Sequence, residues 1–176
     1  MIYLSADLHC GHFNIIEYCK RPFKTVEEMN QVIMNNWNAT VKEEDTVYLL
    51  GDYAFYRGIS EDWHLNGHII LIRGNHDRGF SDTKLKRFSI ETVHKMPLTI
   101  THELEGAIVD IVLMHAPNQR HMNKVNFCGH VHDKWLYNDG FYNVGVDVHG
   151  FKPILLDDAI KDYRQHMYKE FGEGNK

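Results

Sequence analysis

Side chains that can bind a divalent metal ion follow five short apolar runs of the chain. The runs are rich in Val, Ile, Leu and aromatic residues, as buried strands are. Ligand sites in α/β proteins form at the carboxyl ends of strands, so we expect these side chains to share one metal-binding region. In chain order they are Asp7 and His9, Asp52, Asn75 with His76 and Asp77, His115, and His130 with His132.

The spacing and the types of these residues suit a transition metal. Asp-x-His and His-x-His place alternate side chains on one side of an extended segment, so that both can bind one cation. The carboxylate of Asp52 has two oxygens and can bridge two cations. Carboxylate, amide and imidazole ligands together suit Mn, Fe, Zn, Co or Ni better than Ca or Mg. Each short motif alone is common in loops and turns, so the information lies in their order.

In combination these motifs resemble the signature of the calcineurin-like metallophosphoesterases. The resemblance runs from residue 7 to 132, and residues 143–147 and 151–153 are similar to the endings of small bacterial and phage-type members. It implies an α/β fold, a four-layer α/β/β/α sandwich of two packed mixed sheets with a dinuclear metal site at strand C-terminal ends. The motifs are Asp7-Leu8-His9, Gly51-Asp52, Gly74-Asn75-His76-Asp77, His115 and Gly129-His130-Val131-His132.

The resemblance also implies which residues hold the two metal ions. Manganese is the expected metal, with iron, zinc, nickel and cobalt as alternatives. The His115 assignment rests on a single residue, so His102 and His121 are alternatives to it. One ion would be held by Asp7, His9, Asp52 and His132, and the other by Asp52, Asn75, His115 and His130, with Asp52 as the bridge.

The implied reaction is hydrolysis of a phosphate ester, with a hydroxide that bridges two divalent ions attacking phosphorus in line. By the same resemblance, His76 protonates the leaving oxygen. Asp77 would orient His76 or cap the next segment. Arg73 could bind a phosphate oxygen through its forked donors, or be a surface arginine at a strand end. His12 would contact phosphate or support a neighbouring ligand.

The substrate is expected to be a small phosphate ester or a nucleotide. A chain of 176 residues leaves no room for a cap domain beyond the sandwich, so we expect one domain over residues 1–176 and an open cleft. An open cleft favours phosphodiesters. The alternatives are a phosphomonoesterase and a non-catalytic interaction scaffold of the same fold. A metal-storage protein would lack Asp52 and Asn75, and a metallo-β-lactamase-type hydrolase would need His-x-His-x-Asp-His, which is absent.

Composition narrows the setting of this activity. Thirteen histidines are an excess that points to metal, while 19 basic against 24 acidic residues argue against an extended nucleic-acid surface. The start of the chain has no basic segment typical of a signal peptide, and no apolar run approaches a membrane span. Three cysteines suit a reducing compartment, so we expect a cytoplasmic protein. The sequence gives no indication of the oligomeric state.

The pattern of elements predicts how the site is positioned. The first half of the chain alternates strand and helix, which favours a parallel sheet, and the strand-rich second half favours a second sheet packed on the first. A capping box at Thr25 and Glu28 predicts a helix start, and Asn138-Asp139-Gly140 predicts a hairpin turn. Further helices are expected over 14–20, from Ser81 through Phe88, and from near Asp157. The predicted strands are Ile2–Ala6, Thr46–Leu50, His68–Ile72, Leu98–His102, Ala107–Met114, Val125–Cys128 and Phe141–Val146.

Overall fold

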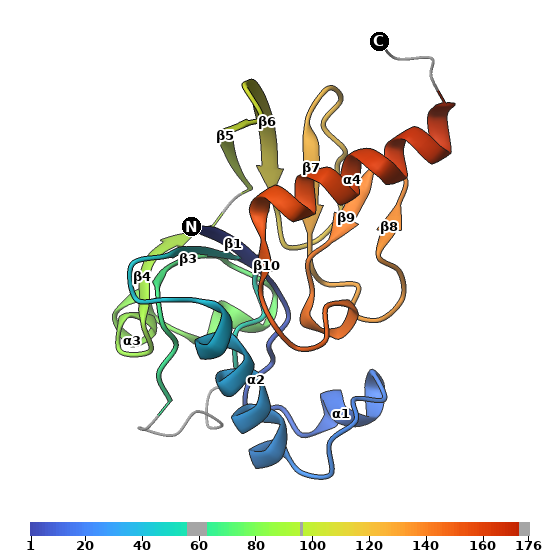
Figure 1. Ribbon diagram of the computed structural model, residues 1–176. Helices are drawn as coiled ribbons and strands as arrows, with labels where there is room; N and C mark the ends of the chain where they lie inside the picture. The colour runs from blue at the N-terminus through green and yellow to red at the C-terminus, as the bar shows by residue number, and fades with distance from the viewer. Residues whose placement is uncertain (56–62, 96, 173–176) are drawn as a thin grey trace.

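The computed structural model describes residues 1–55, 63–95 and 97–172, and these residues form two five-stranded sheets (Figure 1). The first sheet has the order β10-β1-β2-β3-β4. Its neighbours are parallel except β10, which is antiparallel to β1. The strands are β1 (Ile2–Ser5), β2 (Thr46–Leu49), β3 (His68–Ile72), β4 (Ile90–His94) and β10 (Ile154–Leu155).

The second sheet has the order β5-β6-β7-β9-β8. Antiparallel pairs stand at its two edges, whereas β6, β7 and β9 run parallel. Asp139 and Gly140 both have positive φ between β8 and β9, which confirms the predicted hairpin turn. Its strands are β5 (Leu98–Leu104), β6 (Ala107–Leu113), β7 (Val125–Cys128), β8 (Tyr137–Asn138) and β9 (Phe141–Asn143). The two mixed sheets confirm the predicted fold class.

Helices α2 (Val26–Thr40) and α3 (Asp82–Lys86) begin where capping residues predict. The Thr25 hydroxyl accepts the backbone N–H of Glu28 at 3.2 Å, and the Glu28 carboxylate accepts that of Lys24 at 2.7 Å. Ser81 caps a shorter helix by accepting the N–H of Lys84 at 3.2 Å. Among the described residues no helix is long and apolar enough to span a membrane. The helices are α1 (Asn14–Tyr18), α2 (Val26–Thr40), α3 (Asp82–Lys86) and α4 (Leu156–Phe171), with 3-10 turns at His76–Gly79 and Val146–Val148.

Alternate residues of the first sheet face two different cores. Tyr3 and Val47 pack into a cluster with buried side chains of α2, such as Trp37. Leu4 and Leu50 point the other way, into a cluster that contains residues of the second sheet. Because strand side chains alternate between faces, the first sheet is buried on both sides, as its near-continuous apolar sequence predicts.

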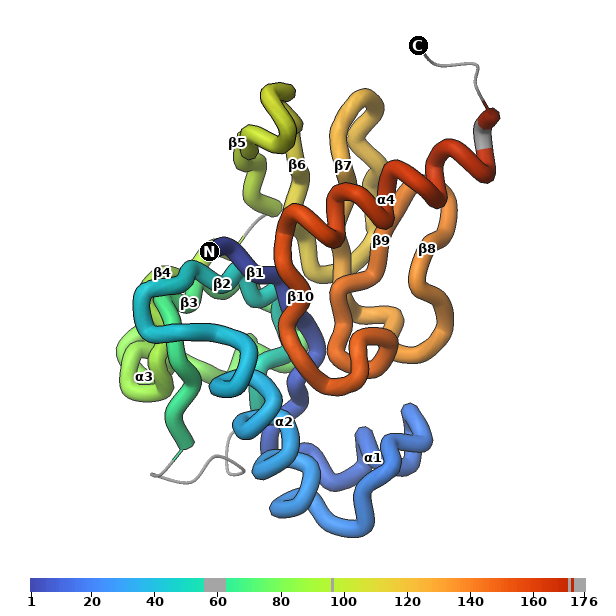
Figure 2. The backbone as a smooth tube through the Cα atoms, viewed as in Figure 1, coloured from blue at the N-terminus to red at the C-terminus, as the bar shows by residue number. Residues whose placement is uncertain are grey.

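Helix α4 completes the core between the sheets. Its buried residues Leu156, Ile160 and Tyr163 belong to the same cluster as Phe127 of β7. In Figures 1 and 2, α4 crosses in front of the second sheet, and α1 and α2 lie at the other end of the molecule, beside the first sheet. Helices α1 and α2 thus pack on one face of the first sheet, whereas α4 packs into the core that the two sheets share.

Two strands of the first sheet had no sequence signal. β4 is an edge strand with Glu91 and Thr92 exposed, so it lacks a continuous apolar run. β10 is only two residues long and pairs with β1 across the whole length of the chain. The helix after Ser81 ends at Lys86 and β9 ends at Asn143, each shorter than predicted.

Candidate metal centre

The ends of β1, β2 and β3 and those of β6 and β7 bring the predicted ligands together. The facing ligand atoms of two groups of three side chains lie within 4.8 Å of one another. These sets are Asp7, His9 and His132, called the buried group, and Asp52, His115 and His130. Asn75 Oδ1 lies 3.0 Å from His115 Nε2, so Asn75, His115 and His130 are called the open group, with Asp52 named separately.

Asp52 lies between the two groups. Its Oδ2 is 3.4 Å from His9 Nε2 in the buried group and 3.5 Å from His115 Nε2 in the open group. Its Oδ1 accepts the backbone N–H of His76 at 2.9 Å, which holds the carboxylate in place. One carboxylate oxygen that faces both groups has the position expected of a bridging ligand.

The open group has the spacing of side chains around one cation. His115 Nε2 lies 3.0 Å from Asn75 Oδ1 and 3.2 Å from His130 Nδ1. Ligands that are each about 2.0–2.2 Å from an ion stand roughly 3–3.5 Å apart. His115 Nδ1 lies 2.8 Å from the carbonyl oxygen of Leu50. A proton donated to that carbonyl leaves Nε2 with its lone pair for a metal.

The structure places only His115 of the three alternative histidines at this site. His102 Nε2 lies 2.7 Å from Asp157 Oδ1 at the start of α4. The loop around His121 is held by Asn126, which accepts the N–H of His121 at 2.8 Å. The strand end after β6, rather than the nearby histidines, therefore supplies the side chain.

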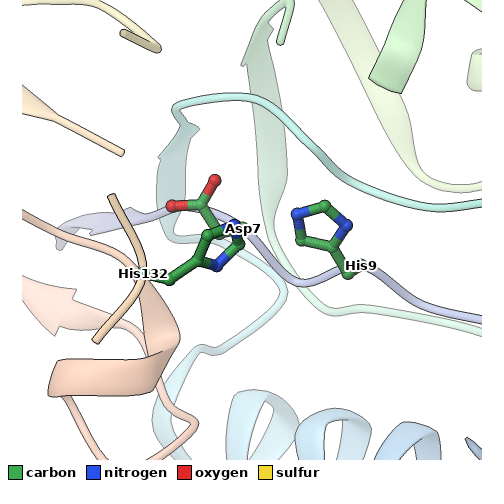
Figure 3. A group of neighbouring side chains, drawn as sticks. All are labelled: Asp7, His9 and His132. Atoms are coloured by element: carbon green, nitrogen blue, oxygen red, sulfur yellow. The ribbon is translucent and has the colours of Figure 1, made fainter. Parts of the chain in front are cut away.

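The buried group contains polar atoms that lack a partner. Asp7 is fully buried, and its Oδ2 accepts the backbone N–H of His130 at 2.8 Å. Asp7 Oδ1 and His9 Nε2 are buried and have no hydrogen bond. Figure 3 shows both side chains on the segment after β1, with His132 approaching from another loop. Buried polar groups are rarely left unsatisfied, and a cation at this point would satisfy both atoms, so the residues fit a metal.

Five of the seven predicted ligands have a left-handed backbone. Positive φ is unfavourable for residues with a Cβ and costs about 1–2 kcal/mol each. Such strain gathers at functional sites, where the surrounding structure enforces it. The φ angles are 58° for Asp7, 51° for His9, 53° for Asp52, 72° for His130 and 52° for His132.

Two glycines allow the strand ends to approach one another. A Cβ on Gly74 would overlap the Asp52 carboxylate. A Cβ on Gly51, whose φ is 83°, would lie 2.5 Å from His115 Nδ1. Any side chain at these positions would displace a ligand, so glycine is required by the close packing of the site.

An ion pair that sequence reasoning missed supports the buried group. Arg21 donates to both carboxylate oxygens of Asp147, at 2.7 and 2.9 Å, and to the carbonyls of Asp7 and Leu8 at 2.8 and 3.0 Å. Asp147 Oδ2 lies 3.1 Å from His132 Nδ1. A carboxylate on the second ring nitrogen orients a metal-binding histidine. Asp147 lies in the segment 143–147 that resembles other family members, but the sequence assigned it no role. Arg21 is 126 residues away along the chain, and no sequence motif pointed to it.

Burial and mutual contacts shift the pKa values of several side chains in the site. Burial raises the pKa of Asp7 to about 7, although the nearby His115 and His132 oppose this. Burial disfavours protonation of His115, but its contacts with Asp52 and Asp7 outweigh burial and raise its pKa to about 9. Burial is likewise outweighed at His132 by Asp147 and Cys19, and its pKa rises to about 10. Asp52 is buried, but the His115 and His9 rings keep its pKa well below its usual range.

Two further histidines lie beside the ligands. His12 Nδ1 is 3.2 Å from His9 Nδ1, and its ring stacks on Phe55 with centroids 4.0 Å apart. His76 Nε2 is 4.0 Å from Asp52 Oδ2, and its side chain is 38% exposed. His12 therefore contacts His9, whereas the partly exposed His76 forms a set with His9 and Asp52.

Arg73 and Asp77 are engaged with the backbone. Both terminal nitrogens of Arg73 are occupied, by the carbonyls of Asp77 and Phe80 and by the Asp82 carboxylate at 2.6 Å. These contacts favour a role in fixing the turn after β3 over phosphate binding. Asp77 does not orient the His76 ring. Its buried carboxylate accepts three backbone N–H groups, those of Asp52, Tyr53 and Gly74, at 2.8–2.9 Å.

Comparisons with known proteins cover the same segment. Residues 2–145 match the family described as the calcineurin-like phosphoesterase superfamily domain. An uncharacterized protein of Methanocaldococcus jannaschii is 33% identical over 168 residues, which cover 91% of this chain and 89% of that protein. The gene 66 protein of Mycobacterium phage L5 is 24% identical over 206 residues, with 97% of each chain covered. A crystal structure of an Aquifex aeolicus protein of unknown function matches with a TM-score of 0.71 and 26% identity, over 92% of this chain and 98% of that chain.

Proposed function

The chain belongs to the calcineurin-like phosphoesterase superfamily, and from this premise we propose that it is a dinuclear metal-dependent phosphohydrolase that prefers phosphodiesters. The family supports metal-dependent phosphoester hydrolysis in general. The observation that carries the dinuclear assignment is the single oxygen of Asp52 that faces His9 on one side and His115 on the other.

Each group of candidate ligands would hold one metal ion. The buried group with Asp52 would hold one divalent ion, and the open group with Asp52 the other. We propose manganese, because the site mixes carboxylate, amide and imidazole ligands. Such ions, when bound, supply Lewis-acid activation of water and neutralise charge on the phosphoryl oxygens.

The remaining residues of the site would act on protons and position. His76 Nε2, which is exposed beside Asp52, would donate a proton to the leaving oxygen of the ester. His12 would keep the His9 ring oriented through the contact between their Nδ1 atoms. Arg73 would hold the turn that carries Asn75 and His76 rather than contact the phosphate.

The preference for diesters rests on an open site. We propose that residues 1–176 form one domain without a cap, which would leave room for the second ester group of a diester. A cavity of about 850 Å³ adjoins the open group and is large enough for a bulky substituent. A cytoplasmic location is also part of the proposal, supported by three cysteines that form no disulfide.

The test compares two chromogenic esters with Mn²⁺ present and after chelation. We expect faster turnover of bis-p-nitrophenyl phosphate than of p-nitrophenyl phosphate, and loss of both on chelation. Turnover that persists without metal would refute the mechanism, and a faster monoester reaction would make the protein a phosphatase. If Mn²⁺-loaded protein hydrolyses no ester in a broader screen that includes 2′,3′-cyclic nucleotides, the fold serves as a scaffold.

A further inference from the structure

A cavity extends from the open group to a part of the surface that the proposed reaction does not use. Asn75, His115 and His130 are among the residues that line its volume of about 850 Å³. Arg78, from the turn after β3, and Lys95, which follows β4, also line it. A volume of this size accepts a ligand as large as a nucleotide.

The cavity carries uncompensated positive charge. The side chains of Arg78 and Lys95 have neither a hydrogen bond nor an ion pair to any residue within the described ranges. The wall also contains a carboxylate, that of Asp82, which pairs with Arg73 at 2.6 Å and is also attracted by Lys95. Three positive side chains, those of Arg73, Arg78 and Lys95, against the one carboxylate of Asp82 leave the wall of this cavity with a net positive charge, which attracts an anion.

Several apolar side chains line the cavity beside these charged groups. Ile72 and Phe80 are buried side chains at the floor of the cavity, and Pro97 and Met114 also line it. A cavity with apolar walls and a few charged groups suits a ligand that has a ring system and a separate anionic group. A nucleotide has both, since its base is a flat ring and its phosphates stand at a fixed distance from it.

We propose that this cavity binds the second phosphate of a nucleotide substrate through Arg78 and Lys95, with the base against the apolar wall. The inference rests on the proposed function, because the reacting phosphate would lie at the open group. The preferred substrates are therefore phosphodiesters of nucleotides that carry an additional phosphate, rather than simple diesters. Arg78 and Lys95 determine specificity and take no part in bond breaking.

Equilibrium binding tests the phosphate site without turnover. Calorimetry on the Mn²⁺-loaded protein compares thymidine 3′,5′-bisphosphate with thymidine 5′-monophosphate. We expect the bisphosphate to bind about tenfold more tightly, as charge-assisted contacts to one extra phosphate allow. The R78Q/K95Q variant should lose this difference. The matched control R164Q/K169Q removes two exposed charges from α4 and should keep it.

Kinetics then separates this inference from the proposed function. The wild-type protein should hydrolyse the dinucleotide pTpT with a lower KM than TpT, which lacks the 5′-phosphate, and R78Q/K95Q should bring the two KM values together. If bis-p-nitrophenyl phosphate is hydrolysed but R78Q/K95Q binds the bisphosphate like the wild type, the phosphate site is refuted and the phosphohydrolase stands. If no ester is hydrolysed but the bisphosphate preference depends on Arg78 and Lys95, the phosphate site is supported and the proposed function fails.

Discussion

The buried group and the open group differ in what surrounds them. Asp7 and His9 are 0% and 1% exposed, whereas Asn75 and His130 are exposed. The buried group is supported by the Arg21–Asp147 ion pair, in which Asp147 contacts His132. The open group is supported by the backbone instead, because the His115 ring contacts the carbonyl oxygen of Leu50.

We expect the two groups to have different roles because of this difference in burial. The metal-binding side chains of the buried group are held by a buried carboxylate and shielded from solvent, so their positions should change little when a substrate binds. The open group faces the cavity, so its ion would be the one that meets an incoming phosphate. We infer that the buried group retains its metal more tightly and that the open group governs access of the substrate.

Removal of Asp52 should abolish the distinction, because Asp52 faces both groups. We expect D52A to bind neither ion and to lose at least about 10³-fold in kcat/KM. Metal content and turnover measure this. The control D110A changes an exposed carboxylate on β6 and should retain both ions. A D52A protein that still holds two ions would disprove the bridge.

Replacement of His76 should separate chemistry from metal binding. H76A should keep both ions, because His76 is not in the proposed ligand set, but lose about 10²–10⁴-fold in kcat on esters with poor leaving groups. On p-nitrophenyl esters the loss should be small, because a good leaving group needs no proton. Turnover across a series of leaving groups measures this, with the exposed His64 replaced in H64A as the control. Equal losses on good and poor leaving groups would contradict an acid role.

Two single substitutions should weaken one group each. D147N removes the carboxylate that orients His132 and should lower metal affinity about 10–100-fold at the buried group only. N75A removes a ligand of the open group and should weaken that group alone. Stepwise Mn²⁺ titration resolves the two sites.

A structural control accompanies D147N, because this change leaves Arg21 buried without its charge partner. D162N removes a carboxylate that accepts the Tyr142 hydroxyl, away from the site, and should leave both affinities unchanged. Thermal unfolding in chelator shows whether D147N is folded. If folded D147N and N75A weaken the same binding step, the two groups are not separate sites.

The pH dependence should be steeper for the buried group. In the metal-free chain the pKa values of Asp7 and His132 are raised to about 7 and about 10, so both groups hold protons that a metal must displace. In the open group only His115 has a raised pKa, about 9. Displaced protons make affinity rise with pH, by up to about tenfold per pH unit for each proton. Titrations between about pH 6 and about pH 8 measure the slopes, and parallel slopes would contradict the assignment.

Local patterns predicted the parts of the fold that depend on neighbouring residues. The Thr25 cap and the turn at Asp139 and Gly140 appear where the sequence places them, since each involves residues no more than four apart. The ligands at five strand ends also follow from local order, because parallel strands bring their carboxyl ends to the same edge. The structure brings all seven together, although their binding of metal remains a proposal.

Other features depended on contacts that no local pattern contains. Arg21 and Asp147 meet across 126 residues, and β10 reaches β1 from the far end of the chain. The left-handed backbone at the ligands was not predicted, because aspartate and histidine adopt positive φ more often than most residues with a Cβ but still adopt it rarely. Arg73 looked free to bind phosphate until the fold placed Asp82 and two carbonyls around it.

Residue types and their order along the chain were enough to predict the family, the type of fold and the candidate ligands. The packing of distant segments was needed to show that one group of ligands is buried beside the Arg21–Asp147 pair and that the other lines a cavity with cationic side chains. Burial and pairing depend on which distant segments pack together. The thirteen histidines divide in the same way, for their number suggested a metal, and their positions in the fold separate ligands from helpers such as His12 and from those paired elsewhere, such as His102.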